Sequence, residues 1–431
     1  MDGRSPAELE LLEKATRFLP GATLGNIALP EALRFLAREG KGPHLQDVSG
    51  NTYIDWLMGS GPMVLGHAHP AVVDAVVHAV ERGSHYFTTN ELAVELAEAI
   101  VEAIPCAEQL RYTTSGTDAN FQCLRAARVF RKRDRVLKFE GGFHGTSDYA
   151  LMSVSPAIGE VDYPRALRSS GGIPTALEDL VLTAPFNDLE TTTRIIEENH
   201  DELAAVILEP LQRVIPPVAG FLEGLREVTA RHGVLLIFDE VVTGFRLSYG
   251  GAQEYYGVVP DLCSVGKIVG GGYPLAAAVG RRDVLACYDA SLVAPGDFVN
   301  QIGTLNGNPI ACAAGLATLA ELRKPGTYET LREIGGGLRG ALTGVLERHG
   351  VAAQCCGDDT AFDIVFSDRP IASYRDTAAA DGEKLARMNA GLLERRILKS
   401  WPQKFYPSLV HGDEDITRTA EALEALMPRL G

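Results

Sequence analysis

The sequence lacks the features that mark a membrane or secreted protein. It has no run of 18 or more apolar residues, so no segment is predicted to span a membrane. The N-terminus is charged and has no apolar signal core. The seven cysteines show no Cys-x-x-Cys spacing, and the adjacent Cys355 and Cys356 cannot pair without strain. These absences favour a reduced, cytoplasmic protein.

Positive charge is scarce. The chain has 40 Lys and Arg against 56 Asp and Glu, a net charge of −16 and a pI of about 5.1. This balance argues against nucleic acid or an anionic membrane as a main partner. A metal site has little support either, because His67 and His69 have no third ligand at a recognisable spacing and a turn explains them better. The 431 residues, 46% of them hydrophobic, are enough for two domains and a sizeable core.

The order of predicted elements indicates an α/β fold. Short continuous apolar runs, typical of parallel strands buried on both faces, alternate with helical patterns. Strands are expected at 110–113, 136–139, 203–208, 234–238, 262–265 and 276–279, and helices at 5–18, 70–81, 91–104, 115–131, 220–231 and 308–323. A hairpin is expected at 44–56, and helices 328–348, 379–396 and 413–429, with short strands near 351–366, indicate a second, smaller unit. Residues 153–176 form either a mobile lid or an ordinary surface excursion.

Lys267 stands directly after a predicted buried strand and shortly before three consecutive glycines. An amine delivered into a Gly-lined space suits covalent chemistry, in which the ε-amino group attacks a carbonyl or forms a Schiff base. For this residue alone, an ordinary strand-capping lysine is the simpler interpretation. A phosphate-binding P-loop fails, because Asp261 and Ile268 stand where that motif needs Gly and Ser or Thr.

Other chemistry-bearing residues also follow predicted strands. Ser115, Gly116 and Thr117 begin a helix, where they form either a phosphate seat or only a helix cap. The carboxyl ends of parallel strands meet at one edge of a sheet, which gathers the residues that follow them. The residues in question are Phe143, His144, Glu209 and Asp239. The strand before Asp239 also resembles a Walker B strand, but an ATPase is disfavoured without a Walker A partner.

Together these residues match the requirements of pyridoxal phosphate (PLP). The phosphate needs an anion hole, the ring an aromatic face, the ring nitrogen a carboxylate, and the aldehyde a lysine. The chain offers Ser115 to Thr117, Phe143, Asp239 and Lys267 in that order. We therefore expect a PLP-dependent enzyme, and the intact lysine and aspartate argue against a non-catalytic binding protein.

The sequence resembles the class III, fold-type I aminotransferases, in the branch like glutamate-1-semialdehyde aminomutase. The resemblance covers nearly the whole chain and rests on residues 65–70, 115–120, 141–145, 237–246, 264–274 and 303–309. It implies a large domain with a mostly parallel sheet flanked by helices, and a smaller α+β domain. The implied division is 1–65 (N-terminal segment of the small domain), 66–310 (large PLP-binding domain) and 311–431 (small C-terminal domain).

The resemblance also implies how a cofactor is held. It implies a homodimer with the active site at the subunit interface, where Thr304 reaches the phosphate of the neighbouring subunit's cofactor. It further implies that Val241 packs on the ring face opposite Phe143, and that His144 and Glu209 belong to the cofactor site. Gln212 is the candidate for the ring hydroxyl.

Three departures from the aminomutase concern its substrate. The N-terminal loop, residues 21–28, lacks the arginine that binds the substrate carboxylate, Ser60 replaces a tryptophan, and Gln403 falls where a glutamate is expected. Arg213 is either a substrate carboxylate contact or a surface arginine. We expect an aminotransferase that moves an amino group from an amine or amino acid donor to an oxo acceptor through a Lys267 Schiff base and pyridoxamine phosphate. A 2,1-aminomutase, or a racemase or epimerase, is the alternative.

Overall fold

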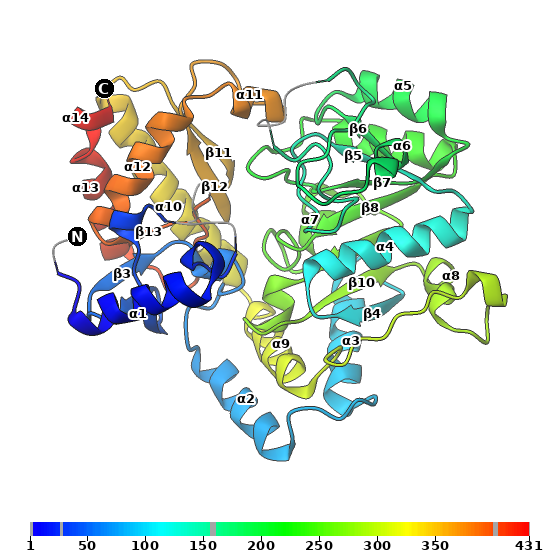
Figure 1. The fold of residues 1–431 in the computed structure, drawn as a ribbon, viewed down its shortest axis with the longest axis horizontal. Coiled ribbons are helices and arrows are strands. Elements are labelled where there is room, and N and C mark those ends of the chain that lie inside the picture. The colour runs from blue at the N-terminus through cyan, green and yellow to red at the C-terminus, as the bar shows by residue number, and fades with distance from the viewer. Residues whose placement is uncertain (1–2, 26–28, 156–160, 400–403, 431) are drawn as a thin grey trace. The chain divides into compact units, whose positions relative to one another are not determined.

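The computed structural model describes residues 3–25, 29–155, 161–399 and 404–430, and they form two compact units (Figure 1). Unit 1 comprises residues 1–70, 325–370 and 379–431, and unit 2 comprises 71–324 and 371–378. Within the described ranges, no helix is both long and apolar enough to cross a membrane.

Unit 2 is built on a seven-stranded sheet. The strand order is β4-β10-β9-β8-β7-β5-β6. The strands are β4 (Gln109–Thr113), β5 (Arg135–Phe139), β6 (Val181–Ala184), β7 (Leu203–Leu208), β8 (Leu235–Glu240), β9 (Leu262–Val265) and β10 (Ala276–Gly280). Only β10 runs antiparallel to its neighbours, and every residue of β6 to β10 is buried. The predicted α/β class with a mostly parallel sheet is confirmed.

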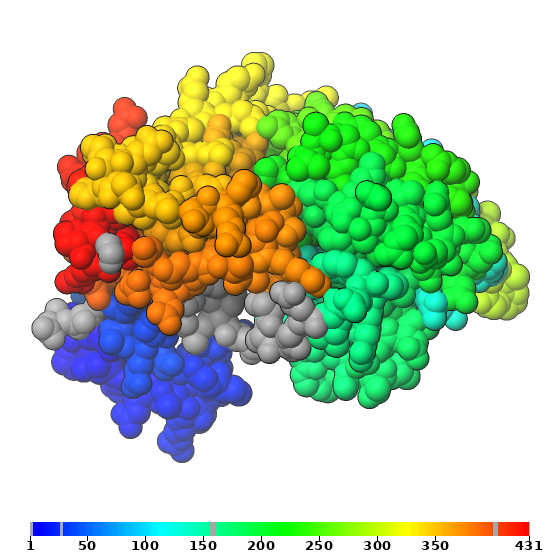
Figure 2. All heavy atoms as spheres, turned by 90° about the horizontal axis from the view of Figure 1, so that it is seen from above, coloured from blue at the N-terminus to red at the C-terminus, as the bar shows by residue number. Residues whose placement is uncertain are grey.

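Helices cover both faces of this sheet. The α-helices are α2 (Pro70–Arg82), α3 (Glu91–Ala103), α4 (Gly116–Arg131), α5 (Leu189–Asn199), α6 (Phe221–Arg231), α7 (Gly251–Tyr256), α8 (Arg282–Leu285), α9 (Pro309–Leu322) and α11 (Tyr374–Ala378). The 3-10 helices are η5 (Thr175–Leu180), η6 (Lys267–Gly270), η7 (Ala286–Tyr288) and η8 (Pro295–Asp297). Helix α9 packs on α3 and η6. In Figure 2 the green part of the chain, which includes α5 and α6, forms a continuous surface in this view.

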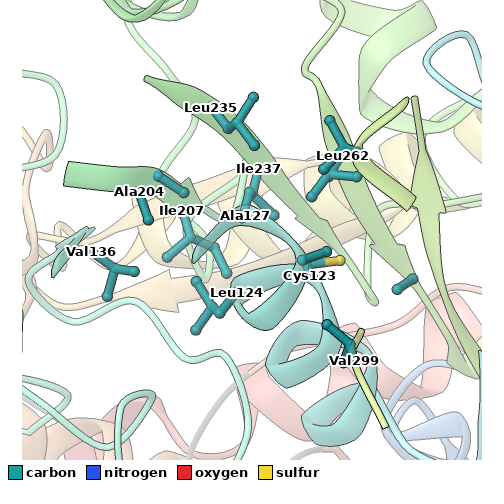
Figure 3. Packing of buried hydrophobic residues seen from close by; sticks show 14 of the residues in the cluster. Cys123, Leu124, Ala127, Val136, Ala204, Ile207, Leu235, Ile237, Leu262 and Val299 are labelled. Carbon is teal, nitrogen blue, oxygen red and sulfur yellow. The ribbon is translucent and has the colours of Figure 1, made fainter. Parts of the chain in front are cut away.

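The main core of unit 2 lies between α4 and one face of the sheet. Figure 3 shows Cys123, Leu124 and Ala127 of α4 facing Ile207 of β7 and Ile237 of β8. On the other face, the rings of Phe139, Phe186 and Phe221 meet edge to face, with centroids 5.0–5.8 Å apart. Because α4 is anchored along its apolar side, its N-terminus is fixed at the carboxyl edge of the parallel strands.

Unit 1 holds a four-stranded sheet and a hairpin. The sheet order is β1 (Ala37–Lys41), β2 (His44–Asp47), β3 (Thr52–Asp55) and β13 (Ile397–Leu398), and the hairpin is β11 (Gln354–Asp358) with β12 (Ala361–Val365). The helices are α1 (Pro6–Phe18), α10 (Thr327–Arg348), α12 (Gly382–Glu394), α13 (Asp413–Glu424) and α14 (Met427–Leu430), with η1 (Pro20–Ala22), η2 (Glu31–Leu33) and η3 (Met58–Ser60). The predicted hairpin at 44–56 is confirmed by the pairing of β2 with β3.

Some element predictions were wrong or incomplete. The helix expected at 413–429 is two helices, α13 and α14, because Pro428 lacks the N–H that a continuing helix needs. Strand β6 and helix α5 were not predicted, since the four-residue apolar run of β6 follows a weakly periodic stretch. Helix α11 was also missed; it belongs to unit 2 although the chain on both sides of it belongs to unit 1.

Candidate active site

The candidate site lies where β8 and β9 end, side by side. In this parallel pair Asp239 stands opposite Ser264, so both reach the same edge of the sheet. Lys267 follows two residues after β9, as the first residue of η6, and its backbone is left-handed with φ of 50°. A left-handed residue turns the chain sharply away from the strand direction. The two residues with the strongest chemical prediction therefore come from adjacent strand ends.

Asp239 is the centre of a buried hydrogen-bond network. Its Oδ2 accepts from Asn120 Nδ2 at 2.8 Å and lies 2.8 Å from His144 Nδ1. Its Oδ1 accepts from the Val241 N–H at 3.1 Å and lies 3.2 Å from the hydroxyl of Ser264. Because an ionised carboxylate only accepts, Nδ1 of His144 carries the proton that they share.

The network keeps Asp239 ionised. Burial favours the neutral form and would raise the pKa of Asp239, since the carboxylate is taken out of water. The hydrogen bond and charge of His144, the Val241 N–H and the Asn120 amide outweigh that effect and hold the pKa below its ordinary value. The site thus presents a fixed negative charge at the bottom of a low-dielectric region.

Two members of this network were not assigned a role from the sequence. Asn120 lies on the buried side of α4, and its Oδ1 accepts from the Ser264 hydroxyl at 2.7 Å. Ser264 is fully buried inside β9. The signal available in the sequence was a polar residue within an otherwise apolar helix face or strand, which carries a cost unless the residue is hydrogen-bonded.

The N-terminus of α4 is open toward the same edge. Ser115 is the N-cap, and its hydroxyl accepts from the Asp118 N–H at 3.2 Å. The N–H groups of Gly116 and Thr117 precede that turn and have no intrahelical acceptor, as in any helix start. A Cβ on Gly116 would stand 2.8 Å from both Cγ atoms of Val241, so only glycine permits this close approach. Val241 therefore lies directly against the predicted phosphate seat.

Phe143 lies on a loop after β5 whose backbone is held by side chains. Its N–H donates to Glu209 Oε1 at 2.8 Å, and the residue is 39% exposed. The Arg213 guanidinium lies 5.0 Å from the ring centroid, and Arg213 Nε donates to Gly141 O at 3.1 Å. The Thr146 N–H donates to the hydroxyl of Thr117, which joins the loop to α4. An aromatic ring is thus fixed with part of its surface accessible.

Gln212 is fully buried beside this loop. Its Nε2 donates to Glu140 O at 2.8 Å, while its Oε1 has no hydrogen-bond partner among the described residues. His144 Nε2 is likewise buried without a partner in the described part of the chain. Both atoms lie within 3.6 Å of the position that a Cβ on Gly142 would take. Unsatisfied buried polar atoms carry a cost, and they cluster at functional sites.

These features fit the cofactor expected from the sequence. Free N–H groups at the start of α4 suit a phosphate, and the missing Cβ of Gly116 lets Val241 pack directly against that helix start. The ionised Asp239 suits a protonated ring nitrogen, and the partly exposed ring of Phe143 suits a flat heterocycle. Within the described ranges, no group of three or more His, Cys, Asp or Glu has the geometry of a metal site.

The remaining predicted residues lie elsewhere. Thr304 is exposed, on the wall of a surface pocket of about 550 Å³ that residues 85–90, 303–304 and 306–309 help to line. Ser60 belongs to unit 1, in a turn where Met58, Gly59, Ser60 and Gly61 all have positive φ. Gln403 lies outside the described residues, as does the stretch 26–28 in which the expected arginine is missing.

Comparison with known proteins gives a consistent result. Residues 29–426 match the family model for class-III aminotransferases. Glutamate-1-semialdehyde 2,1-aminomutase 2 from Brevibacillus brevis is 38% identical over 422 residues, covering 96% of each chain. An omega-transaminase from Sphaerobacter thermophilus superposes with a TM-score of 0.93 at 34% identity, covering 98% of each chain. A β-phenylalanine aminotransferase from Variovorax paradoxus superposes with a TM-score of 0.88 at 32% identity, covering 99% of this chain and 94% of that one.

Proposed function

The chain belongs to the class-III aminotransferase family, and from that premise we propose which substrates it takes and which residues carry the reaction. It is a PLP-dependent transaminase that moves an amino group from a donor to an oxo acceptor. We propose that its donors are amines or amino acids whose amino group is not α to a carboxylate. The omega-transaminase and β-phenylalanine aminotransferase relatives support this class.

Bound PLP supplies an electron-accepting ring that stabilises negative charge on the donor carbon. In our proposal Lys267 would hold the cofactor through its ε-amino group, and with a donor bound that amine would serve as the base and acid that moves the donor's proton. Asp239 keeps the ring nitrogen protonated. The observation that carries this assignment is the buried Asp239 carboxylate with hydrogen bonds from Asn120, His144 and the Val241 N–H, which keep it ionised; only an ionised carboxylate can hold that proton.

The other contacts follow from the same placement. We assign Phe143 and Val241 to the two ring faces, and Gly116 and Thr117 N–H groups with the exposed Ser115 to the phosphate. Gln212 Oε1, which has no partner among the described residues, is proposed to accept from the ring hydroxyl. Glu209 and His144 act indirectly, by positioning residues that contact the cofactor. Glu209 accepts the Phe143 N–H, and His144 hydrogen-bonds to Asp239.

We further propose a homodimer in which Thr304 serves the neighbouring subunit's cofactor phosphate. Three large apolar side chains in or beside the Thr304 pocket, Phe87, Ile302 and Leu305, are 52–78% exposed. Exposed apolar area of this kind marks an interaction surface, and a second copy is the occupant that the family resemblance favours. All seven cysteines are free, which supports the reducing cytoplasm as the location.

An amino-transfer assay tests the proposed reaction. Purified enzyme in the PLP form is incubated with β-phenylalanine, 1-phenylethylamine or glutamate-1-semialdehyde, with and without pyruvate or 2-oxoglutarate. We expect stoichiometric transfer from at least one of the first two donors, and only when an acceptor is present. The 38% identical aminomutase makes isomerisation the second candidate. Isomerised glutamate-1-semialdehyde formed without acceptor, faster than any intermolecular transfer, would establish that candidate instead.

A further inference from the structure

Lys138 is a buried lysine that the reaction as described does not use. It lies in β5, one residue before the strand ends, and is 1% exposed. Its ammonium donates to three backbone carbonyls, Gly142 O at 2.9 Å, Ala150 O at 3.0 Å and Met152 O at 2.5 Å. In the described part of the chain it forms no ion pair. A buried charge of this kind is costly, so its three matched acceptors call for an explanation.

The three carbonyls bracket the residues that carry the proposed cofactor contacts. We call residues 142–152 the stacking segment, because Phe143 and His144 lie in it. Gly142 is at its start and Ala150 and Met152 are at its end. Lys138 therefore joins both ends of the stacking segment to one point on β5. A three-donor cation satisfies all three carbonyls, whereas no neutral side chain of that length has three N–H groups.

Other side chains hold mainly the first part of this loop, although the Arg128 guanidinium lies 4.0 Å from the ring centroid of Tyr149 near its end. Glu209 accepts the Phe143 N–H, Arg213 donates to Gly141 O, and Thr117 accepts the Thr146 N–H. None of these three contacts reaches the end of the segment at residues 150–152. Backbone hydrogen bonds from Gly141 N–H to Ser153 O and from Ser169 N–H to Leu151 O, each 2.8 Å, also hold this end. Lys138 is the side chain that links Ala150 O and Met152 O to Gly142 O, so its removal should loosen the return of the loop and with it the Phe143 ring.

We propose that Lys138 is a positioning residue for the cofactor, which fixes the stacking segment and thereby the ring of Phe143 against which the cofactor packs. The inference rests on the proposed placement of the cofactor at Phe143. It does not depend on which donor or acceptor the enzyme uses. Lys138 contacts neither substrate nor cofactor in this proposal, and it acts through the loop backbone.

The protonation state of Lys138 sets the conditions for a test. Burial, and then the positive charge of Arg213, lower the pKa of Lys138 to about 7, while Glu209 acts in the opposite direction. Above that pKa the neutral amine has two N–H donors for three carbonyls. Variants are therefore compared at pH 6, where the wild-type side chain carries all three protons.

The test compares Lys138→Met, which removes all donors, with Lys138→Gln, which keeps two. We expect the cofactor dissociation constant to rise about 10- to 100-fold in Lys138→Met and less in Lys138→Gln, the scale of lost hydrogen bonds to a charged group. The visible circular dichroism of the bound cofactor, which reports ring orientation, should change in the same order. Arg226→Met is the matched control. It removes an ion pair to Asp261 at the opposite end of the strands, and should lower the melting temperature alone.

Three results would overturn the inference. The first is a Lys138→Met protein with wild-type cofactor affinity and dichroism and a lower melting temperature. The second result does not need the variant to fold. If Lys138 fixes the stacking segment, hydrogen exchange across residues 142–152 should be as slow in the wild-type apoprotein as in the holoenzyme. A large increase in exchange on cofactor removal would show instead that the cofactor orders the loop. The third result is wild-type cofactor affinity and dichroism in Phe143→Leu, which would reject the proposed placement of the cofactor at Phe143. If Phe143→Leu is defective in these measurements and Lys138→Met is not, only the role of Lys138 is rejected.

Discussion

The surroundings of Asp239 and those of Thr304 differ in burial and in hydrogen bonding. Asp239 is buried and takes hydrogen bonds from Asn120 of α4, from His144 in the loop after β5 and from the Val241 N–H two residues further on. Thr304 is exposed and lies on a pocket wall beside large apolar side chains that are also exposed to solvent. The surroundings of Asp239, the complete region, are thus formed within a single chain. The surroundings of Thr304, the incomplete region, have the properties of a surface that needs a partner.

This difference determines what a substitution should do in each region. Around Asp239 the dielectric is low and the partners are fixed, so a lost charge acts on the chemistry and leaves assembly intact. Around Thr304 a lost contact acts through the association of subunits, and its effect on catalysis follows from weaker cofactor binding. Substitutions at Lys267, Asp239 and Leu305 distinguish these two effects.

Lys267→Ala should give the largest effect. The residue stands at the end of β9, beside the complete region, and the proposal makes it both the attachment point and the proton carrier. We expect turnover to fall by a factor on the order of 10⁴ or more, the scale for removal of a covalent catalyst. Steady-state assays give the rate, and borohydride reduction followed by peptide mapping should find the cofactor on Lys267 in the wild type. A label on another lysine, or residual turnover near wild type, contradicts the assignment.

Asp239→Asn should come next, with a loss of about 10²- to 10³-fold in kcat, the scale for one preorganised electrostatic partner. The amide keeps only one acceptor oxygen, so either the Val241 N–H or the Asn120 amide loses its acceptor; the melting temperature should fall somewhat while the dimer stays intact. The lowered pKa means that wild-type Asp239 stays ionised at every pH above about 5, so its protonation should not shape the activity profile there. Near-wild-type rates in Asp239→Asn would make this carboxylate structural.

Leu305→Asp tests the incomplete region. Leu305 is 52% exposed, and we expect an added charge to shift the protein toward monomer and weaken cofactor binding by about 10-fold or more. Light scattering coupled to size exclusion measures the mass, and absorbance titration measures the affinity. Val259→Asp is the matched control, since Val259 is 45% exposed and lies just before β9, away from the pocket lining. A fully active monomer would reject the shared site.

The sequence predicted the complete region better than the incomplete one. Lys267 and Asp239 each follow an apolar strand, and parallel strands place such residues at one edge, so their proximity followed from local patterns. Asn120 and Ser264 were left without a role, because their partners come from elements distant in sequence. Lys138 was left without one because its partners are carbonyls of a loop that has no periodic pattern. Thr304 was reached through family resemblance alone, since a partner's contribution leaves no periodic pattern in one chain. Most of helix α9 was expected to be the first element of the small C-terminal domain. It lies in unit 2 instead, because it packs against α3, and this packing cannot be read from the local sequence.

Arg213→Gln should give the smallest effect, and it decides between two roles. The Nε of Arg213 is used by Gly141 O, while no hydrogen bond to its two terminal nitrogens is found among the described residues. Their N–H groups could therefore bind a substrate carboxylate. The guanidinium also lies 5.0 Å from the Phe143 ring centroid, so packing on that ring is the alternative role. If Arg213 binds a carboxylate, KM for β-phenylalanine should rise about 10-fold while KM for 1-phenylethylamine, which has no carboxylate, stays unchanged.

The alternative has a different signature in the same assay. If Arg213 acts by packing on Phe143, both donors should be affected equally and the dichroism of the bound cofactor should shift. Arg213→Lys separates the outcomes further, because lysine keeps the charge and loses the planar fork that pairs with a carboxylate and stacks on a ring. A donor-selective defect in both variants would place Arg213 at the substrate. A donor-independent one would place it with Glu209 and Lys138, among the side chains that hold the loop carrying Phe143.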